Sequence, residues 1–295
     1  MTKIAHLPSA SRLTNRSVIE VGGEERRAFL QGLISNDMND CMPGQAIYAA
    51  LLTPQGKFLH DLFIIDSEKY FLIDCESARV EDLIKRLLRY KLRSKITIEN
   101  KTVIYDCWAL WKDADLSAFV EKTNTPNSLF YVDPRLPELG LRAIINKFDK
   151  LDGVKICDFE AYDKHRLALG APDGSRDMII EKSTLLECNF DFLHGISWTK
   201  GCYTGQELTA RTHYRGLIKK RLYPVSIKGA VPAPGSTIYR DTAEVGEMRS
   251  SSANSGLALL SIEMAERAIN EAIDFTCDNS QITALRTISR KLRPN

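Results

Sequence analysis

Apolar residues recur along the first third of the chain at spacings that predict short strands separated by a helix and by turns. Residues 17–21, SVIEV, predict a strand, and residues 24–34 place apolar side chains on one helical face. Residues 46–75 then predict three consecutive strands, because the turn-forming sequences PQG and DSEK divide one apolar stretch into three. The pattern indicates a strand-to-helix unit followed by an antiparallel meander.

The middle of the chain continues this mixture of strands and helices. An amphipathic helix is expected from about residue 80, since Val80, Leu83 and Leu87 recur at helical spacing while basic residues occupy the other side. Further elements are expected as strands at 95–100, 102–110 and 139–145, a loop at 123–137, and a helix at 159–170. Together they predict a mixed α and β body.

The composition changes near residues 231–235, VPAPG, and the segments that follow predict a β-rich lobe. Short strand candidates at 236–240, 243–250 and 255–262 alternate with turn-forming residues. We therefore interpret residues 1–220 as the main body and residues 221–295 as a C-terminal β-lobe.

Composition favours a globular protein of a reducing compartment. The chain has 295 residues, more than one domain usually holds, and its net charge of only +2 argues against wholesale coating of nucleic acid. Seven cysteines are spread along the chain without paired metal-ligand spacing, which argues against a self-contained zinc site. No apolar run reaches the length of a membrane span, so no membrane association is expected.

The opening segment bears on the expected compartment. MTKIAHLPSASRLTNRS lacks the apolar core of a secretory signal peptide and only faintly resembles a mitochondrial transit peptide. A strand that begins by Ser17 leaves little room for a removable leader. We expect a cytoplasmic protein, or a protein of the mitochondrial matrix if the source is eukaryotic.

Residues 200–211, KGCYTGQELTAR, combine more chemistry than any other stretch. Thr204 and Glu207 have the spacing of a capping box, which predicts a helix with Thr204 as its N-cap. Cys202 would then precede a helix N-terminus. The partial positive charge of that terminus and the ammonium of Lys200 would both lower the pKa of the thiol.

Two glycines, Gly201 and Gly205, flank this thiol and would leave room for a ligand or partner to approach closely. The alternative is a buried, inert cysteine in a glycine-containing turn, because free cysteine is among the most buried residue types. The local physics leaves both interpretations open.

The sequence KGCYTGQE resembles the signature of the YgfZ-type folate-binding proteins, which include a bacterial tRNA-modifying factor and mitochondrial iron–sulfur assembly relatives. The resemblance covers nearly the whole chain, because further segments follow in the expected order: FLQGLISND from residue 29, LLTPQGKFLHDLFII from 51, RYKLRSKITI from 89, LLECNFDFLHGISW from 185 and AEVGEMRSSSANSGLALL from 243. It implies the α+β fold of the glycine-cleavage aminomethyltransferase (GcvT), with intertwined N-terminal and central ferredoxin-like lobes and a small C-terminal β-barrel lobe.

The resemblance also implies a function in the assembly or repair of iron–sulfur clusters, particularly for [4Fe-4S] enzymes and for tRNA modification. Cys202 is the family's functional cysteine, and Lys200, Gln206 and Glu207 match the motif around it. A thiolate is a competent iron ligand, but a cluster normally takes four protein ligands. Cys202 would therefore share a transient cluster with a partner, for which an A-type cluster carrier is the hypothesis.

Tetrahydrofolate is the cofactor that the resemblance implies. Its predicted contacts are Glu187, which lies where aminomethyltransferases carry a pterin-binding glutamate, Asp177 of the R-D segment, Tyr162 as a stacking ring, and Asp61. Arg16 occupies a position where some relatives have an aromatic residue, so stacking at that position is lost.

The chain departs from the aminomethyltransferase pattern at one carboxylate pair. Where those enzymes have G-G-x-x-D-D, this chain has GKFLHD at 56–61, so His60 replaces the first acid. His60 could titrate near neutrality, although adjacent strand residues point to opposite faces and His60 and Asp61 cannot address one substrate. The resemblance therefore makes a classical enzyme doubtful, with a tetrahydrofolate-dependent aminomethyltransferase or demethylase as the alternative.

Two other functions are compatible with parts of the sequence. Cys202 could be the nucleophile of a hydrolase, with His194 or His213 as its base, although the resemblance supplies no such dyad. The basic segments 85–95 and 213–222 have interleaved tyrosines, but such runs are usually solvated surfaces. We do not expect direct nucleic-acid binding.

Overall fold

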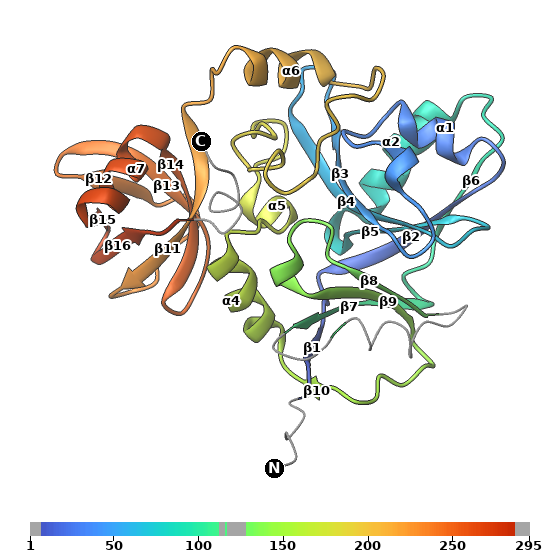
Figure 1. Ribbon diagram of the computed structural model, residues 1–295, viewed down its shortest axis with the longest axis horizontal. Coiled ribbons are helices and arrows are strands. Elements are labelled where there is room, and N and C mark those ends of the chain that lie inside the picture. Colours follow the sequence, from blue (N-terminus) through green and yellow to red (C-terminus); the bar gives the residue numbers. More distant parts are fainter. Residues whose placement is uncertain (1–6, 112–115, 117–127, 287–295) are drawn as a thin grey trace. The chain divides into compact units, whose positions relative to one another are not determined.

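The computed structural model describes residues 7–111, 116 and 128–286, which fall into two compact units. Of the described residues, the first unit comprises 7–51, 60–111, 116, 128–162 and 194–204, and the second comprises 52–59, 163–193 and 205–286. The chain thus passes repeatedly from one unit to the other (Figure 1). The second unit includes the tip of the hairpin predicted around the PQG turn.

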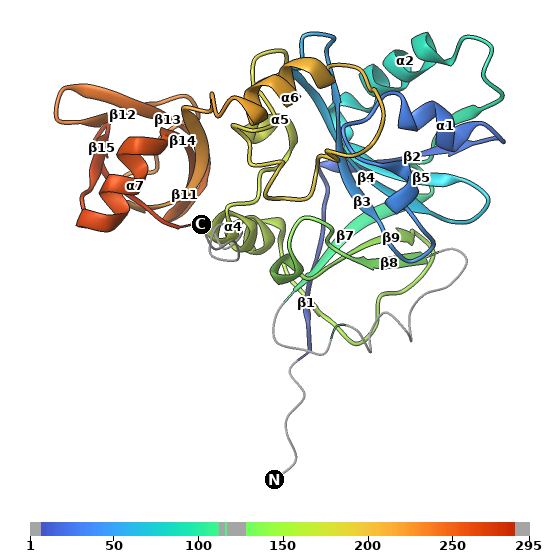
Figure 2. The ribbon, with the colours of Figure 1, turned by 45° about the horizontal axis from the view of Figure 1, so that its top comes forward.

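The first unit contains two five-stranded sheets (Figure 2). One sheet has the order β3 (Ile47–Leu52), β4 (Phe58–Asp66), β5 (Phe71–Glu76), β2 (Arg16–Gly22) and β6 (Thr97–Asn100). The other has the order β10 (Lys155–Ile156), β1 (Ser9–Arg12), β7 (Tyr105–Trp111), β9 (Leu141–Asn146) and β8 (Ser128–Val132). Every residue of β3 and β4 is buried, which matches the near-continuous apolar sequence of the predicted meander.

Helices and short 3₁₀ turns join these strands. The helices are α1 (Arg26–Gln31), α2 (Val80–Lys91), α4 (Phe159–Leu169), α5 (Gly174–Asp177), α6 (Gln206–Tyr214) and α7 (Ile262–Glu271), and the 3₁₀ turns are η1 (Met38–Asp40), η2 (Ser77–Arg79) and η3 (Pro137–Leu139). Val80, Leu83 and Leu87 of α2 are buried, so the amphipathic pattern of this helix is confirmed.

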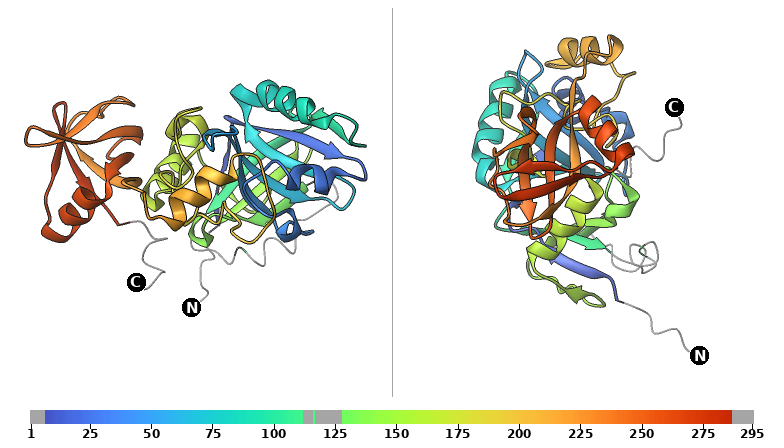
Figure 3. Two further views of the ribbon diagram at one scale, coloured as in Figure 1. Left: turned by 90° about the horizontal axis from the view of Figure 1, so that it is seen from above. Right: turned by 90° about the vertical axis from the view of Figure 1, so that its left-hand side faces the viewer.

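Six strands at the C-terminal end close into a barrel, drawn in orange and red in Figure 3. Their order is β11 (Lys220–Lys228), β14 (Ser255–Ser261), β13 (Ala243–Ser252), β12 (Thr237–Arg240), β15 (Phe275–Cys277) and β16 (Ser280–Ala284). The core of the barrel is apolar, with Tyr223, Ile238 and Phe275 among its buried residues. The predicted α+β fold with a small C-terminal β-barrel is confirmed.

The structure corrects several local predictions. The segment predicted as a loop at 123–137 contains strand β8, whose SLFYV sequence pairs with β9; residues 123–127 lie outside the described residues. Strand β1 was not predicted, because four residues of mixed polarity give too short a pattern. Strand β1 is fixed by pairing with β7 and β10, which are distant in sequence, whereas β8 pairs with β9, the next strand along the chain. Neither pairing is recorded in the local pattern of the segment itself.

Candidate functional site

Cys202 is the one exposed cysteine among the seven, all of which lie in described residues. Cys157 is half-buried, and the others are buried: Cys41, Cys75, Cys107, Cys188 and Cys277. Burial raises the pKa of the Cys41 and Cys188 thiols to about 12. The alternative of a buried, inert cysteine in the KGC motif is therefore wrong, and Cys202 is the thiol that a partner can reach.

Cys202 lies in a short arch, residues 200–204, that is attached at both ends to the loop formed by residues 31–36. At one end, the Lys200 ammonium donates hydrogen bonds to backbone carbonyls of this loop. At the other end, the backbone N–H of Thr204 donates to Gly32 O at 3.2 Å. Between these ends, a Cβ on Gly201 would meet nothing within 4 Å. The arch therefore exposes its thiol on an open side.

The side chain of Lys200 points into the protein. It is only 7% exposed, and its Nζ donates to Gln31 O at 2.7 Å, Ile34 O at 2.8 Å and Asn36 O at 2.7 Å. Burial lowers the pKa of Lys200 to about 8, against a smaller opposing effect of Asp37. The sequence predicted Lys200 as a cation beside the thiol. In the structure, all three N–H donors of its ammonium are hydrogen-bonded to backbone carbonyl oxygens.

The capping-box prediction at Thr204 and Glu207 is wrong. Helix α6 begins at Gln206, and its N-cap is Gly205, which has φ +84° and makes no side-chain cap hydrogen bond. A Cβ on Gly205 would lie 2.5 Å from Thr53 O and 2.9 Å from Leu52 Cβ. The left-handed conformation and the close approach to the chain at 52–53 both require glycine, and they override the local capping signal.

Gln206 and Glu207 occupy the first turn of α6, where Gln206 is half-buried and Glu207 is exposed. A carboxylate there is favoured by the partial positive charge of the helix N-terminus. The structure thus explains why an acid suits this position, while any role of these two residues in binding stays a prediction.

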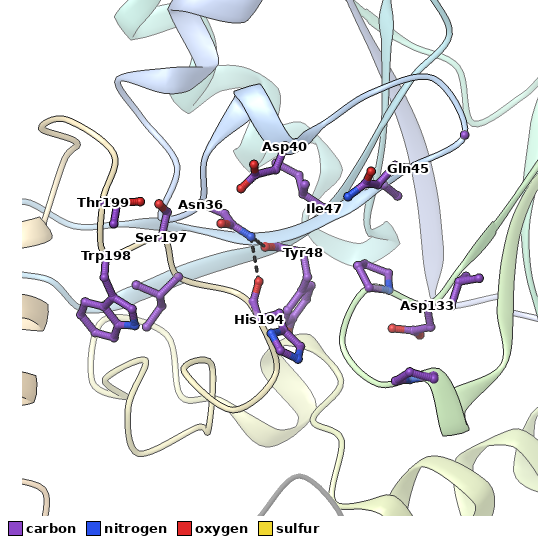
Figure 4. Close-up of a pocket in the computed structure, with 16 residues that line it drawn as sticks. Asn36, Asp40, Gln45, Ile47, Tyr48, Asp133, His194, Ser197, Trp198 and Thr199 are labelled. Atoms are coloured by element: carbon purple, nitrogen blue, oxygen red, sulfur yellow. Dashed lines mark hydrogen bonds between the residues drawn. The ribbon is translucent and has the colours of Figure 1, made fainter. Parts of the chain in front are cut away.

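The first unit contains a cavity of about 710 Å³, shown in Figure 4. Its apolar wall includes Tyr48 and Trp198, and its polar atoms include those of Asn36, Asp133 and His194. Asn36 Nδ2 donates to Tyr48 O at 2.8 Å and to His194 O at 2.7 Å, which ties together two segments of the wall. The volume and the mixture of rings with few polar groups are typical of a small-molecule site.

The cavity and the thiol arch share one stretch of chain. Ser197, Trp198 and Thr199 line the cavity and lead directly into Lys200. Ser197 N donates to Ser35 O at 3.0 Å, so the cavity wall is attached to the same loop as the arch. Sequence reasoning had not singled out Tyr48 and Trp198 as binding residues, although both lie in or beside segments that carry the family resemblance.

The predicted folate contacts are divided between the two units, and each is engaged by protein groups. In the first unit, Asp61 Oδ1 accepts from Arg16 Nη1 at 2.9 Å, and Tyr162 OH accepts from Arg135 Nη2 at 3.2 Å. Both Asp61 and Tyr162 are buried. Tyr162 packs 5.7 Å from the Trp111 ring, centroid to centroid, within the apolar core.

In the second unit, Asp177 is buried and accepts from Arg166 Nη1 at 2.6 Å and from Ser250 N at 3.0 Å. Glu187 is half-buried, and its Oε2 accepts from Thr184 Oγ1 at 2.7 Å. Of these four residues, Glu187 keeps the most access to solvent. A folate role for each of the four stays a prediction.

His60 does not titrate near neutrality, contrary to the prediction. The ring is buried, and desolvation lowers its pKa to about 4, with the nearby Arg79 guanidinium acting in the same direction. His60 Nε2 lies 2.9 Å from Asp82 Oδ2 on α2. Asp61 instead bonds Arg16, so the two neighbours have separate partners, as their alternation along strand β4 predicts.

The described residues contain neither a cluster of metal ligands nor a membrane-spanning helix. No group of three or more His, Cys, Asp or Glu side chains in this part of the chain could hold a metal ion. Within the same residues, no helix has both the length and the apolar character needed to cross a membrane.

One family model matches the C-terminal lobe of this chain, and several known proteins match most of its length. The family model described as CAF17, C-terminal beta-barrel domain, matches residues 219–287. The Homo sapiens protein named iron-sulfur cluster assembly factor IBA57, mitochondrial, is 33% identical over 272 residues, which cover 84% of this chain and 76% of that protein. The Mus musculus protein of the same name is 31% identical, with 94% and 83% covered. A homologue in Mycosarcoma maydis is 32% identical, and the match spans 78% of this chain but only 60% of that relative.

Among solved structures, glycine cleavage system aminomethyltransferase T from Bartonella henselae has the same fold. The match has a TM-score of 0.77 at 12% sequence identity and covers 96% of this chain and 86% of that one. At this identity the likeness concerns the fold alone, and it confirms the predicted aminomethyltransferase-like architecture.

Proposed function

The chain belongs to the IBA57 family of iron–sulfur cluster assembly factors, and we propose that it supports the assembly or repair of iron–sulfur clusters in [4Fe-4S] client enzymes, including enzymes that modify tRNA. The observation that carries the proposal is the exposed thiol of Cys202. By the same proposal the chain works in the mitochondrial matrix of a eukaryote, or in the cytoplasm of a prokaryote, since the relatives above are named as mitochondrial.

Because only one exposed cysteine is present among the described residues, the protein would need a partner to hold a cluster. A thiolate is a good iron ligand, but a cluster normally requires four protein ligands, and no described cluster of side chains supplies the other three. Cys202 would therefore contribute one ligand to a cluster that a partner also holds. The partner we propose is an A-type cluster carrier, which brings its own cysteines.

The test is to mix this protein with an A-type carrier, ferrous iron and sulfide under anaerobic conditions. We expect a complex with the visible absorption of an iron–sulfur cluster, seen by size-exclusion chromatography. Cys202→Ser should abolish this complex, while Cys157→Ser, which removes the half-buried thiol, should leave it intact. An equal yield of complex from both variants would refute the role of Cys202.

We also propose that tetrahydrofolate binds in the 710 Å³ cavity of the first unit. The observed wall fits such a ligand, because rings and prolines can pack on a pterin while carboxylate and amide oxygens can accept its N–H groups. The half-buried Trp198 would supply ring surface, and the exposed Asp40 together with Asn36 would supply oxygen atoms. When bound, tetrahydrofolate can supply one-carbon chemistry, but the proposal requires only that it bind.

Equilibrium binding of tetrahydrofolate tests this site and also tests Glu187. If the cavity is the site, Trp198→Ala should weaken binding by about fivefold or more, since loss of an aromatic stacking contact costs at least about 1 kcal/mol. A loss with Glu187→Ala and none with Trp198→Ala would instead favour the site predicted from the aminomethyltransferase motif.

The alternative function, a tetrahydrofolate-dependent aminomethyltransferase or demethylase, has less support. Asp61 is the remaining acid of the altered pair, and it is buried in an ion pair with Arg16, whose Nη1 lies 2.9 Å from Asp61 Oδ1. A carboxylate held this way would lose its guanidinium partner on turning to a substrate nitrogen, which is costly inside a protein. Turnover of tetrahydrofolate with a methylamine donor would favour the alternative.

A further inference from the structure

The arch that carries Cys202 is held by a buried ammonium whose hydrogen-bond partners are all backbone carbonyls. Lys200 is 7% exposed, and the Asp37 carboxylate acts on its ammonium less strongly than burial does. Three carbonyl oxygens satisfy its three donors, at 2.7 to 2.8 Å. Burying an ammonium costs free energy that a methionine of similar length would not cost. The buried ammonium therefore fixes the position of the arch although it lowers the stability of the folded protein.

The three carbonyls belong to one short turn. Gln31 ends helix α1, and Ile34 and Asn36 follow it, so one ammonium closes the free carbonyl end of that helix and the loop after it. The loop is itself fixed: Ser35 N donates to Ala50 O at 2.9 Å, and Ser35 Oγ donates to Gly195 O at 2.6 Å. Lys200 therefore joins the arch to a rigid support.

The far end of the arch is attached by a backbone hydrogen bond and by a buried ring. Thr204 N donates to Gly32 O at 3.2 Å, and the Tyr203 ring lies 5.1 Å from Lys200 Nζ. Between Lys200 and Thr204, Gly201 has open space around its Cα and Cys202 is exposed. Lys200 supplies three of the hydrogen bonds that hold the arch, and the buried Tyr203 ring packs beside its ammonium, so the direction of the thiol depends on the lysine at one end and on this ring at the other.

We propose that Lys200 is a positioning residue that holds the arch 200–204 on the loop 31–36 so that Cys202 is presented outward in one fixed orientation. The proposal deepens the function proposed above, because a thiol that must join a partner's ligands around one cluster benefits from a defined direction. It differs from the expectation that Lys200 acts by lowering the pKa of the thiol, since its charge is directed at carbonyl oxygens.

The test is a nitroxide attached to Cys202 in the Cys157→Ser background, where the remaining cysteines are buried. We expect a spectrum of restricted motion when Lys200 is present and a mobile spectrum in Lys200→Met. Backbone amides of the arch should exchange hydrogen about tenfold faster or more in that variant, as loss of one charge-assisted hydrogen bond predicts. Lys219→Met, which removes an exposed lysine, should change neither.

Chemical rescue separates the hydrogen bonds from the charge. In Lys200→Ala, added propylammonium should restore restricted motion of the nitroxide, because it supplies the missing carbons and the three donors. Tetramethylammonium, which has the charge but no donor, should not. Rescue by both cations would overturn the proposal. It would also be overturned if Lys200→Met shifted the pH profile of Cys202 alkylation without changing the motion of the nitroxide.

Two further measurements test the role of Lys200 separately from any folding defect of the variants and from the proposed cluster function. In the wild-type protein, reductive methylation should modify Lys200 at least about tenfold more slowly than the exposed Lys219, and equal rates would refute the geometry. A cluster complex that forms normally with Lys200→Met but not with Cys202→Ser would overturn the positioning role alone. Restricted motion that depends on Lys200, without any cluster complex, would support positioning and reject the cluster function.

Discussion

At the scale of single residues, burial decides which side chains keep their ordinary chemistry. His60 shows this most directly, because its pKa is lowered to about 4 by desolvation and by nearby Arg79. Its ring nitrogen faces Asp82, and burial of this carboxylate is outweighed by the hydrogen bond and charge of Arg86, so that the pKa of Asp82 is lowered. From the sequence, His60 could act as an acid or base near neutral pH, but in the folded protein its ring is uncharged at that pH.

The linkage between this pKa and folding gives a prediction. The unfolded chain binds a proton at His60 near pH 6.5 and the folded chain only near pH 4, so His60 contributes stability above pH 6.5 that is lost as the pH falls toward 4. We expect His60 to account for about 2 kcal/mol of lost unfolding free energy between pH 7 and pH 5. Urea denaturation at both pH values measures it.

The comparison variant is His60→Gln, which keeps a hydrogen-bonding group of similar size but does not titrate. Its unfolding free energy should fall less between pH 7 and pH 5 than that of the wild-type protein. An identical fall in both proteins would mean that other groups cause the pH dependence. Asp82 does not interfere, because its lowered pKa places its titration below this window.

At the scale of elements, the start of α6 shows how tertiary contact overrides a local signal. Thr204 and Glu207 have capping-box spacing, yet Gly205 is the N-cap, with φ +84°. The reason is the close approach of Thr53 and Leu52, which leaves no room for a side chain at Gly205. The helix start is therefore set by the hairpin tip at 52–59, which belongs to the same unit.

The two glycines of the motif should respond differently to the same substitution. Gly205→Ala places a Cβ 2.5 Å from Thr53 O at positive φ, so we expect a loss of about 2–4 kcal/mol in unfolding free energy from strain and overpacking. Gly201→Ala meets no atom within 4 Å and should change stability by less than about 0.5 kcal/mol. Chemical denaturation of both variants tests the pair, and equal losses would contradict it.

At the scale of the whole molecule, a buried cluster of charges connects the two sheets of the first unit. Asp74 on β5 accepts from Arg16 Nε on β2 at 2.6 Å and from Arg142 Nη2 on β9 in the other sheet. The guanidinium of Arg142 also lies 3.8 Å from the Phe63 ring centroid. The side chains of Asp74, Arg16 and Arg142 are at most 3% exposed, so these ion pairs are shielded from water.

Removing one member of this cluster should be costly. Arg142→Met leaves the Asp74 carboxylate with one cation fewer inside the protein, and we expect a loss of about 3–5 kcal/mol in unfolding free energy. Arg12→Met is the matched control, because its ion pair with Asp106 is 3.5 Å long and the Arg12 side chain is 54% exposed. That variant should lose less than about 1 kcal/mol, and similar losses from both would refute the importance of burial.

The sequence by itself determined most of the periodic elements, the β-rich character of the C-terminal lobe and the motif around Cys202. These features are local, because the alternation of a strand, the spacing of a helix and eight adjacent residues are all visible along the chain. Strands β3, β4 and β5 follow the predicted meander closely for this reason. The fold class followed from the same patterns together with the family resemblance.

Only the tertiary structure decided what each functional side chain contacts. The partners of Lys200 lie at positions 31, 34 and 36, and the cavity wall joins residues near 36–48, 132–137 and 194–199. The pairing of Asp61 with Arg16 likewise spans 45 positions. Such contacts depend on which polar groups are buried together and must satisfy one another, and that is settled when distant segments pack rather than by any local pattern.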